Sequence, residues 1–365
     1  MNPLSVGIVG CGNISARYLD ADAIFDAFEL VACADLDAEL ARETAAEHGI
    51  EAMGVDELLA SEEVEAIVNL TPPSAHAQVI TDALAAGNHV YTEKPFAATR
   101  EEAATIRERA AEADLLVGSA PDTFLGAGLQ TARRVLDEGR IGDPVGATAH
   151  WTSPGHELWH PNPDLYYREG GGPLFDMGPY YVTALVFLLG SAERVAGSVS
   201  RPHATRTIES DARKGEEIDV EVPTHEAGIV DFASGATANL LMSFDVEAST
   251  LPFPAFEIYG TEGTLALPDP NHFEGPVRVR DHEDDDWETV PLTHEYTDGR
   301  GAGLADLAFA VRGDWEHRTS GALAGHVLDV MSAVRTSSEE SAFATIDSDP
   351  GRPAPLPADF PDVDP

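Results

Sequence analysis

The stretch Leu4-Ser-Val-Gly-Ile-Val-Gly-Cys-Gly-Asn-Ile-Ser15 decides the fold of this chain. The apolar residues around Gly7 predict a short buried strand, which Gly10 and Gly12 interrupt before a helical pattern begins. A strand, a glycine turn and a helix in this order are typical of a dinucleotide-binding turn, because glycines allow a sharp turn and a close approach of pyrophosphate to the backbone. The free N–H groups and the positive end of the helix dipole would hold the phosphates. Any strand–turn–helix connection of a parallel sheet can look similar, so the pattern needs support.

That support comes from the next predicted strand, Phe28–Ala34, which ends at Asp35. Asp35 follows Gly12 by 23 positions (35 − 12), close to the spacing of about 20 at which a carboxylate binds ribose hydroxyls. The alternative is that Asp35 caps the helix that begins near Asp37. A ribose-binding carboxylate would repel a 2′-phosphate, so we expect NAD, with NADP less favoured. Arg42, one helical turn further on, is the residue that could accept that phosphate.

The first third of the chain continues with alternating strand and helix patterns. Strands are predicted at 65–70, 87–91 and 115–118, and helices at about 37–49, 55–60, 77–86 and 100–113. This alternation predicts a Rossmann-type, doubly wound parallel sheet for an N-terminal α/β domain, residues 1–121. Ligands bind beyond the carboxyl ends of such strands. The glycine turn, Asp35, Thr71-Pro72 and Glu93-Lys94 all fall at those ends.

The pattern changes in the predicted second domain, residues 122–350, as expected for a chain of 365 residues that is too long for one core. Strands are predicted at 145–151, 195–201, 226–232, 236–244, 256–259 and 277–280, and helices at 127–138, 180–189, 304–314 and 321–337. Short turns between the strands predict an α+β domain with a large, open, predominantly antiparallel sheet flanked by helices. Residues 351–365 form a Pro/Asp-rich tail for which no regular structure is predicted.

Charge excludes several classes of partner. The chain has 64 acidic and 22 basic residues, a net charge of −42, and the acids are spread along its length. This distribution is typical of a salt-adapted, halophilic surface, and its field would repel nucleic acid and anionic membranes. We also expect no membrane helix and no secretory leader, and therefore a cytoplasmic protein. The two cysteines and the scattered histidines show no metal-ligand spacing, so no metal site is predicted.

Four motifs carry a family resemblance: Gly10-Cys-Gly-Asn-Ile14, Thr71-Pro-Pro-Ser-Ala-His76, Glu93-Lys-Pro95 and Gly170-Gly-Gly-Pro-Leu-Phe-Asp-Met-Gly-Pro-Tyr180. Together they resemble the glucose-fructose oxidoreductase, inositol dehydrogenase and rhizopine-catabolism (Gfo/Idh/MocA) family over nearly the whole chain. The resemblance implies a Rossmann domain followed by an open-sheet domain that often forms homodimers or homotetramers. It also implies hydride transfer between a nicotinamide cofactor and a sugar, a polyol or a related hydroxy compound.

The resemblance also implies roles for individual residues. Cofactor contacts are implied for Gly10, Gly12, Asn13 and Ile14 at the pyrophosphate, Asp35 at the adenosine ribose, Thr71, Pro72 and His76 along the cofactor, Glu93 at the nicotinamide ribose, and Lys94 between nicotinamide and substrate. The catalytic residues implied are Lys94, the family's aspartate at Asp176, and Tyr180, which stands where the family has its catalytic histidine. We predict that Tyr180 accepts the proton, with the Lys94 ammonium favouring the phenolate.

Other interpretations of these residues remain open. His76 could be a packing residue, Glu93 and Lys94 a surface ion pair, Asp176 a helix cap and Tyr180 a core aromatic. Loop residues offered as substrate contacts are Asp122, His156 and His160, the last within Trp159-His-Pro-Asn-Pro163. The function predicted is that of an NAD-dependent sugar or polyol dehydrogenase. The alternatives are an NAD-dependent glycosidase with a transient redox cycle and a cofactor-binding sensor without turnover.

Overall fold

The computed structural model describes residues 2–211, 213–294 and 299–362, and these fall into two compact units. The first unit consists of the described residues within 1–126, 296–325 and 356–365, and the second of those within 127–295 and 326–355. This division differs from the three continuous segments expected from the sequence, because the chain returns to the first unit after forming most of the second. Local patterns of hydrophobicity carry no information about such a return.

The first unit is built on a six-stranded parallel sheet. Its order is β3-β2-β1-β4-β5-β6, and each neighbouring pair is parallel. The strands are β1 (Leu4–Val9), β2 (Phe28–Ala34), β3 (Glu51–Ala52), β4 (Ala66–Asn69), β5 (His89–Thr92) and β6 (Val117–Ser119). Strand β4 is buried at every position, as expected where helices cover both faces of a parallel sheet. The doubly wound sheet predicted from the sequence is confirmed.

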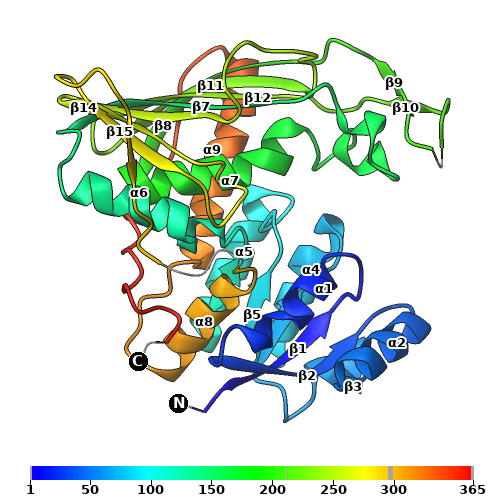
Figure 1. Cartoon of the computed structure of the whole chain (residues 1–365). Helices are drawn as coiled ribbons and strands as arrows, with labels where there is room; N and C mark the ends of the chain where they lie inside the picture. Colours follow the sequence, from blue (N-terminus) through cyan, green and yellow to red (C-terminus); the bar gives the residue numbers. More distant parts are fainter. Residues whose placement is uncertain (1, 212, 295–298, 363–365) are drawn as a thin grey trace. The chain divides into compact units, whose positions relative to one another are not determined.

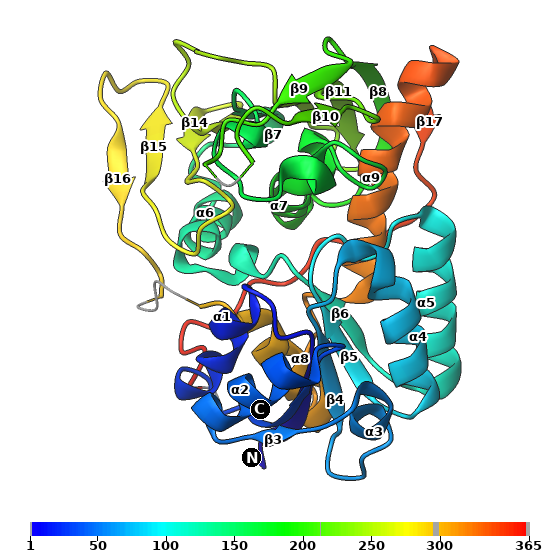
Figure 2. The same cartoon turned by 90° about the vertical axis from the view of Figure 1, so that its right-hand side faces the viewer.

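Helices lie on both faces of this sheet. They are α1 (Ser15–Leu19), α2 (Ala38–His48), α3 (Val55–Leu59), α4 (His76–Ala85), α5 (Arg100–Ala113) and α8 (Ala302–Arg312). Figure 2 shows α4 and α5 side by side on one face, while α8 packs on β2, β5 and β6 from the other. The return of α8 to this sheet explains why residues 299–325 belong to the first unit.

The C-terminal segment is also anchored in the first unit. Phe360 is 3% exposed, and its ring centroid lies 6.0 Å from those of Phe25 and Phe309 and 6.4 Å from that of Trp315. The segment has no helix or strand over 356–362, in agreement with the prediction. Burial of one aromatic ring nevertheless fixes it against the unit.

The second unit is built on a nine-stranded sheet of order β16-β15-β14-β13-β7-β12-β11-β8-β17. All neighbouring pairs are antiparallel except β12 with β7, which is parallel. The strands are β7 (Pro144–Thr152), β8 (Ala192–Ser200), β11 (His225–Phe232), β12 (Thr237–Ser243), β13 (Ala255–Gly260), β14 (Gly263–Ala266), β15 (Val277–Asp281), β16 (Glu288–Val290) and β17 (Ala344–Thr345). A small separate pair joins β9 (Thr205–Thr207) and β10 (Glu217–Asp219). The predicted open, predominantly antiparallel sheet is therefore confirmed.

One face of this sheet is covered by helices. Figure 1 shows α6 (Ala127–Asp137), α7 (Pro173–Leu189) and α9 (Gly321–Glu340) along the same side of the strands. Strand β7 shows the resulting alternation, since Ala147, Ala149 and Trp151 are buried and Thr148 and His150 on the other face are half-exposed. No helix within the described ranges is long and apolar enough to cross a membrane.

Helix α7 begins earlier than the sequence predicted. The sequence predicts a helix at 180–189, whereas the helix begins at Pro173 and Pro179 lies inside it. Proline fits the first position of a helix well, and inside a helix it removes one hydrogen bond. Sixteen residues of α7 are buried, so tertiary packing stabilises the helix through this interruption.

Candidate functional site

The glycine turn after β1 has the geometry of a phosphate cradle. Gly10 has a φ of 103°, and a Cβ there would lie 2.9 Å from the carbonyl group of Leu70, so only glycine fits. A Cβ on Gly12 would meet no atom within 4 Å, so open space lies beside this part of the turn. The Ser15 hydroxyl donates to the carbonyl of Gly12 at 2.7 Å. Gly10 and Ser15 thus fix the conformation of the turn, while the space beside Gly12 stays open.

Asp35 joins the end of β2 to this turn. Its carboxylate accepts hydrogen bonds from the backbone N–H of Cys11 at 2.8 Å and of Asp37 at 2.9 Å. The cap of α2 is Asp37, whose side chain accepts from the backbone of Glu39 and Leu40. The capping role considered for Asp35 therefore belongs to its neighbour, and Asp35 lies beside the glycine turn.

The predicted cofactor-lining residues after β4 differ in exposure. Pro72 is exposed and Thr71 half-buried, whereas His76 is 1% exposed at the start of α4. The two ring nitrogens of His76 face backbone carbonyls, Nδ1 at 2.7 Å from that of Pro95 and Nε2 at 2.8 Å from that of Thr71, and the neutral ring donates to one of them. Burial lowers the pKa of His76, against the effect of these two carbonyls. The ring links the loops after β4 and β5.

Glu93 and Lys94 follow β5 directly. The Glu93 carboxylate accepts from the hydroxyl of the buried Tyr18 at 2.9 Å and from the backbone N–H of Lys94 at 3.0 Å. Nη1 of Arg300 lies 3.6 Å from the same carboxylate. These partners hold Glu93 inward at the carboxyl edge of the sheet, which differs from the exposed ion pair considered for Glu93 and Lys94.

Asp122 does not contact solvent, contrary to the expectation that it is a substrate-contacting loop residue. It is 0% exposed, and its carboxylate accepts from the backbone N–H of Gly301 at 2.9 Å and of Gly303 at 3.2 Å, at the start of α8. Nη1 of Arg300 lies 3.5 Å away. Burial raises the pKa of Asp122, while Arg300 and the two N–H groups oppose that shift. Asp122 therefore fixes the returning segment.

Arg300 is the residue of the first unit that sequence reasoning missed. Its guanidinium lies between the carboxylates of Glu93 and Asp122 and is 17% exposed. The available signal was a cation between two glycines, Gly299-Arg300-Gly301, in a chain with only 22 basic residues. A glycine–arginine–glycine pattern does not indicate which carboxylates the arginine contacts in the folded chain.

In the second unit, the glycine-rich run sets the start of α7. Gly172 has a φ of 98°, and a Cβ there would lie 2.8 Å from the Arg335 guanidinium. Arg335 donates to the carbonyl of Gly171 at 3.0 Å and to the buried carboxylate of Glu226 at 2.7 Å. Glu226 in turn accepts from the backbone N–H of Leu174 at 3.1 Å. A buried ion pair thus fixes the first turn of the helix that carries Asp176.

Asp176 forms a hydrogen-bonded pair with His156. The distance from His156 Nε2 to Asp176 Oδ2 is 2.9 Å, and both side chains are largely buried, at 7% and 13% exposed. The imidazole Nδ1 is buried without a hydrogen-bond partner in the part of the chain that the structure describes. Tyr180 lies one turn further along α7 and is 7% exposed. The structure thus brings together His156 and Asp176, which lie twenty positions apart in the sequence.

Aromatic rings surround this pair. The His156 ring centroid lies 4.3 Å from Tyr166, 4.6 Å from Phe244 and 5.1 Å from Trp159. His160 lies 5.1 Å from the Tyr166 ring, and its Nδ1 accepts from the backbone N–H of Asn162 at 3.0 Å. Burial lowers the pKa of His160. Tyr166 and Phe244 were missed in the sequence because nothing local links them to His156.

Beneath the loop that carries His156 lies a buried ionic network. Arg206 donates to Glu157 at 2.6 Å and also pairs with Asp245, and all three side chains are less than a tenth exposed. The hydroxyl of Tyr167 bonds Glu157 and also accepts from the backbone N–H of His156 at 3.1 Å. Removing one partner of such a buried network is costly, so it holds the loop in a fixed conformation.

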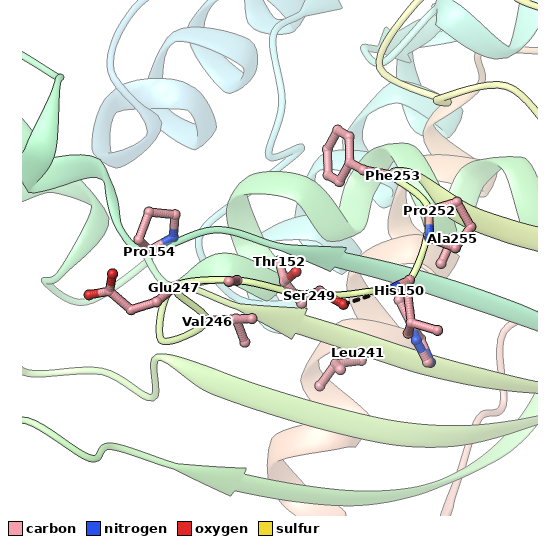
Figure 3. A pocket seen from close by; sticks show the side chains of 12 residues that line it. His150, Thr152, Pro154, Leu241, Val246, Glu247, Ser249, Pro252, Phe253 and Ala255 are labelled. Atoms are coloured by element: carbon pink, nitrogen blue, oxygen red, sulfur yellow. Dashed lines mark hydrogen bonds between the residues drawn. The ribbon is translucent and has the colours of Figure 1, made fainter.

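One further feature of the second unit lies outside this cluster. A groove of ≈ 290 Å³ lies on the open face of the nine-stranded sheet, between His150 and Leu241 on the strands and Phe253 in the loop before β13 (Figure 3). Among the described residues, no group of three or more histidines, cysteines, aspartates and glutamates is arranged to hold a metal ion.

Comparisons with known proteins agree with both units. A family model described as "Oxidoreductase family, NAD-binding Rossmann fold" matches residues 4–120, and one described as "GFO/IDH/MocA C-terminal domain" matches residues 129–266. The chain is 29% identical over 316 residues to a dTDP-3,4-didehydro-2,6-dideoxy-alpha-D-glucose 3-reductase of Streptomyces violaceoruber, covering 85% of each chain. It is 28% identical over 267 residues to a 1,5-anhydro-D-fructose reductase of Ensifer adhaerens, covering 71% of this chain and 74% of that one.

A solved structure shares the fold. The crystal structure of an NAD-binding oxidoreductase from Klebsiella pneumoniae aligns with a TM-score of 0.82 at 24% identity, covering 96% of this chain and 100% of that one. The order of the elements in both units is therefore that of a known oxidoreductase architecture.

Proposed function

Because this chain belongs to the Gfo/Idh/MocA oxidoreductase family, we propose that it is an NAD-dependent dehydrogenase that acts on a sugar, a polyol or a related hydroxy compound. The single observation that carries the proposal is the glycine turn, open at Gly12 and joined to Asp35 through the Cys11 N–H. Such a turn fits a pyrophosphate on one side and a ribose on the other.

In this proposal Gly10, Gly12, Asn13 and Ile14 bind the pyrophosphate, and Asp35 binds the adenosine ribose. Arg42 does not neutralise Asp35 in the structure, because its guanidinium pairs with Glu39 at 3.1 Å on its own helix and lies largely in solvent. This arrangement favours NAD over NADP, since a 2′-phosphate would meet the Asp35 carboxylate while Arg42 is paired elsewhere.

Three contacts support the roles of the remaining first-unit residues. Glu93, held by Tyr18, is oriented to bind the nicotinamide ribose. His76 acts through the loops that it links, placing Thr71 and Pro72 beside the cofactor. Arg300 lowers the electrostatic cost of keeping Glu93 and Asp122 near each other.

When bound, nicotinamide supplies the acceptor or donor for hydride. The chain must then take or return the proton of the substrate hydroxyl, and we assign that proton to Tyr180, with Lys94 and Asp176 as the other catalytic groups. His156 is a positioning residue, because its Nε2 is committed to Asp176 and its Nδ1 is buried. A carboxylate fixed on one oxygen can receive a substrate hydroxyl on the other.

The names of two relatives indicate which substrates to consider. One is named a reductase of a nucleotide-linked sugar and the other a reductase of a free anhydro sugar. Both names denote net oxidation or reduction of a carbohydrate, which favours a dehydrogenase over a redox-cycling glycosidase or a sensor. The half-exposed face of the nine-stranded sheet supports the further proposal of a homodimer or homotetramer.

The test is NADH formation or consumption with the full chain. The chain at high salt would be supplied with NAD and a panel of aldoses, sugar acids and inositols, and with NADH and the corresponding keto compounds. Net change in absorbance at the NADH band supports a dehydrogenase. Cleavage of a glycoside without net NADH formation would instead support the glycosidase. Tight NAD binding without either reaction would support the cofactor-binding sensor.

A further inference from the structure

An exposed aromatic surface lies near Asp176, outside the cofactor turn. Trp159 is 62% exposed, although Trp151 of the same unit is only 8% exposed. The Trp159 ring lies edge-on against the rings of His156 and His160, at 5.1 and 5.3 Å between centroids. We call Trp159, His160 and Tyr166 the aromatic shelf.

The shelf is held in place by its neighbours. His160 lies between the other two members, 5.1 Å from Tyr166, and its ring also accepts a backbone hydrogen bond from Asn162. Tyr166 in turn lies against His156, which bonds Asp176. A ligand with an apolar face can cover this indole and remove it from water, while the polar edge of the ligand stays available for hydrogen bonds.

The polar groups beside the shelf are those that a sugar needs. Asp176 offers a carboxylate held by His156, whose ring contacts both residues: its Nε2 lies 2.9 Å from Asp176 Oδ2, and its centroid lies 5.1 Å from that of Trp159. A pyranose ring presents hydroxyl groups at its rim and C–H groups on its face. Its rim can hydrogen-bond Asp176 while its apolar face stacks on the indole.

The charges around the shelf disfavour an anionic ligand. Most basic side chains in the segments that follow are paired with a carboxylate, and Arg201 donates to the backbone carbonyl of Val220 at 2.6 Å. Examples of the ion pairs are Arg168 with Asp164 at 3.6 Å, Arg213 with Glu216 at 2.8 Å, and Lys214 with Glu209 at 3.1 Å. Arg206 is buried in its own ion pairs. A diphosphate would therefore meet compensated cations in the field of a chain of net charge −42.

We propose that the aromatic shelf is the binding surface for an uncharged sugar ring, and that the substrate is a neutral cyclic carbohydrate and not a nucleotide-linked sugar or a sugar acid. This inference rests on the proposed function and names the substrate class of the same site. Trp159 determines specificity by stacking on the C–H face of the ring, while Asp176 bonds its hydroxyls.

The experiment measures binding by calorimetry with the full chain saturated with NADH, a state in which a sugar alcohol group cannot be oxidised. The probes are methyl β-D-glucopyranoside and 1,5-anhydro-D-glucitol as neutral rings, D-gluconate as a sugar acid and dTDP-glucose as a nucleotide-linked sugar. The variants are Trp159→Ala and Trp159→Phe. Trp287→Phe is the matched control. Trp287 lies directly before β16 and is another exposed indole, at 37% exposed.

We expect at least one neutral ring to bind, and to bind more tightly than either anionic probe. Trp159→Ala should weaken that binding about five- to ten-fold, the size of one aromatic contact, and raise KM for a turned-over neutral sugar by a similar factor with kcat nearly unchanged. Trp159→Phe should retain most of the affinity, and Trp287→Phe all of it.

Three results would overturn the inference: binding of neither neutral ring, tighter binding of dTDP-glucose or D-gluconate, or an unchanged dissociation constant in Trp159→Ala. Failure of the proposed function has a different signature, since NADH itself would then not bind or no carbohydrate of the panel would be turned over. Because Trp159 is exposed, its variants should keep the thermal midpoint of the parent chain.

Discussion

The Nε2 atom of His156 lies 2.9 Å from the Oδ2 atom of Asp176, so a loop after β7 and the first turn of α7 are joined by one hydrogen bond. Both side chains are largely buried, which strengthens the bond relative to an exposed pair. Neither residue lies near the other in sequence, and the pair forms because Tyr166 and Phe244 pack against the imidazole.

His156→Phe should lower kcat/KM roughly ten- to a hundred-fold, because a hydrogen bond to a charged group contributes about 1.5–3 kcal/mol. His156→Gln keeps an N–H donor and should recover part of the loss. The measurement is the pH profile of kcat/KM, together with NAD affinity, which should stay unchanged. His225→Gln is the control, since His225 bonds Ser243 elsewhere in the same unit. Equal profiles for wild type and His156→Phe would remove His156 from the mechanism.

Tyr180→Phe should lower kcat about 10²–10⁴-fold if this hydroxyl accepts the substrate proton. A free tyrosine has a pKa of about 10, so the reaction needs a nearby cation to favour the phenolate. Tyr181→Phe is the matched control, because Tyr181 is fully buried and burial raises the pKa of its hydroxyl well above the usual value. A Tyr180→Phe enzyme within a few-fold of wild type would assign the proton to another group, with Lys94 and His160 as the next variants.

Asp35→Ala should narrow the preference for NAD over NADP, because the carboxylate that repels the 2′-phosphate is lost. Absolute affinity for NAD should also fall, since Asp35 binds the Cys11 N–H of the glycine turn. Asp37→Ser removes a neighbouring charge while keeping a capping oxygen for α2, and it should leave the ratio of the two kcat/KM values unchanged. Comparable efficiency of the wild type with both cofactors would contradict the assignment.

His76→Gln should destabilise the chain by about 1–3 kcal/mol at pH 7.5, because a buried carbonyl loses its partner. Burial lowers the pKa of His76 in the folded state, so below about pH 6.5 the unfolded chain binds a proton that the folded chain excludes. The stability advantage of the wild type should therefore shrink as pH falls from 7.5 to 5.5, by at most about 1.4 kcal/mol per pH unit. Denaturant unfolding at constant salt measures this difference. If the difference in unfolding free energy between the wild type and His76→Gln instead widens at low pH, His76 is protonated in the folded chain and donates to both carbonyls.

Salt should raise the thermal midpoint strongly. The net charge of −42 makes the folded chain repel itself, and the screening length shrinks from about 30 Å at 0.01 M to about 3 Å at 1 M salt. Thermal unfolding in KCl across that range measures the effect, and sucrose at matched osmolarity is the control for general exclusion from the surface. A midpoint independent of salt would contradict a salt-adapted surface.

Elements with local signals could be predicted from the order of the amino acids. Apolar runs that end in glycine, Asp35 or Glu93 predicted the parallel strands and the edge at which their ends meet. The alternation of residues in strands such as β7 predicted a sheet with one covered face. These features follow from the chain's periodicity and from the stereochemistry of glycine, which neighbouring residues alone determine.

The partners of the functional side chains could not be predicted in this way, because they come from distant segments of the chain. Asp122 is expected from the sequence to be a loop residue that contacts substrate, but it accepts hydrogen bonds from the backbone at the start of the returning helix α8. Arg300 follows Asp122 by 178 positions (300 − 122) and lies between the carboxylates of Asp122 and Glu93. The start of α7 depends on the buried Glu226–Arg335 pair, and Asp176 is held by a histidine from another segment. Hydrogen bonds and burial between distant segments depend on how the chain packs, and no local pattern of residue types encodes them.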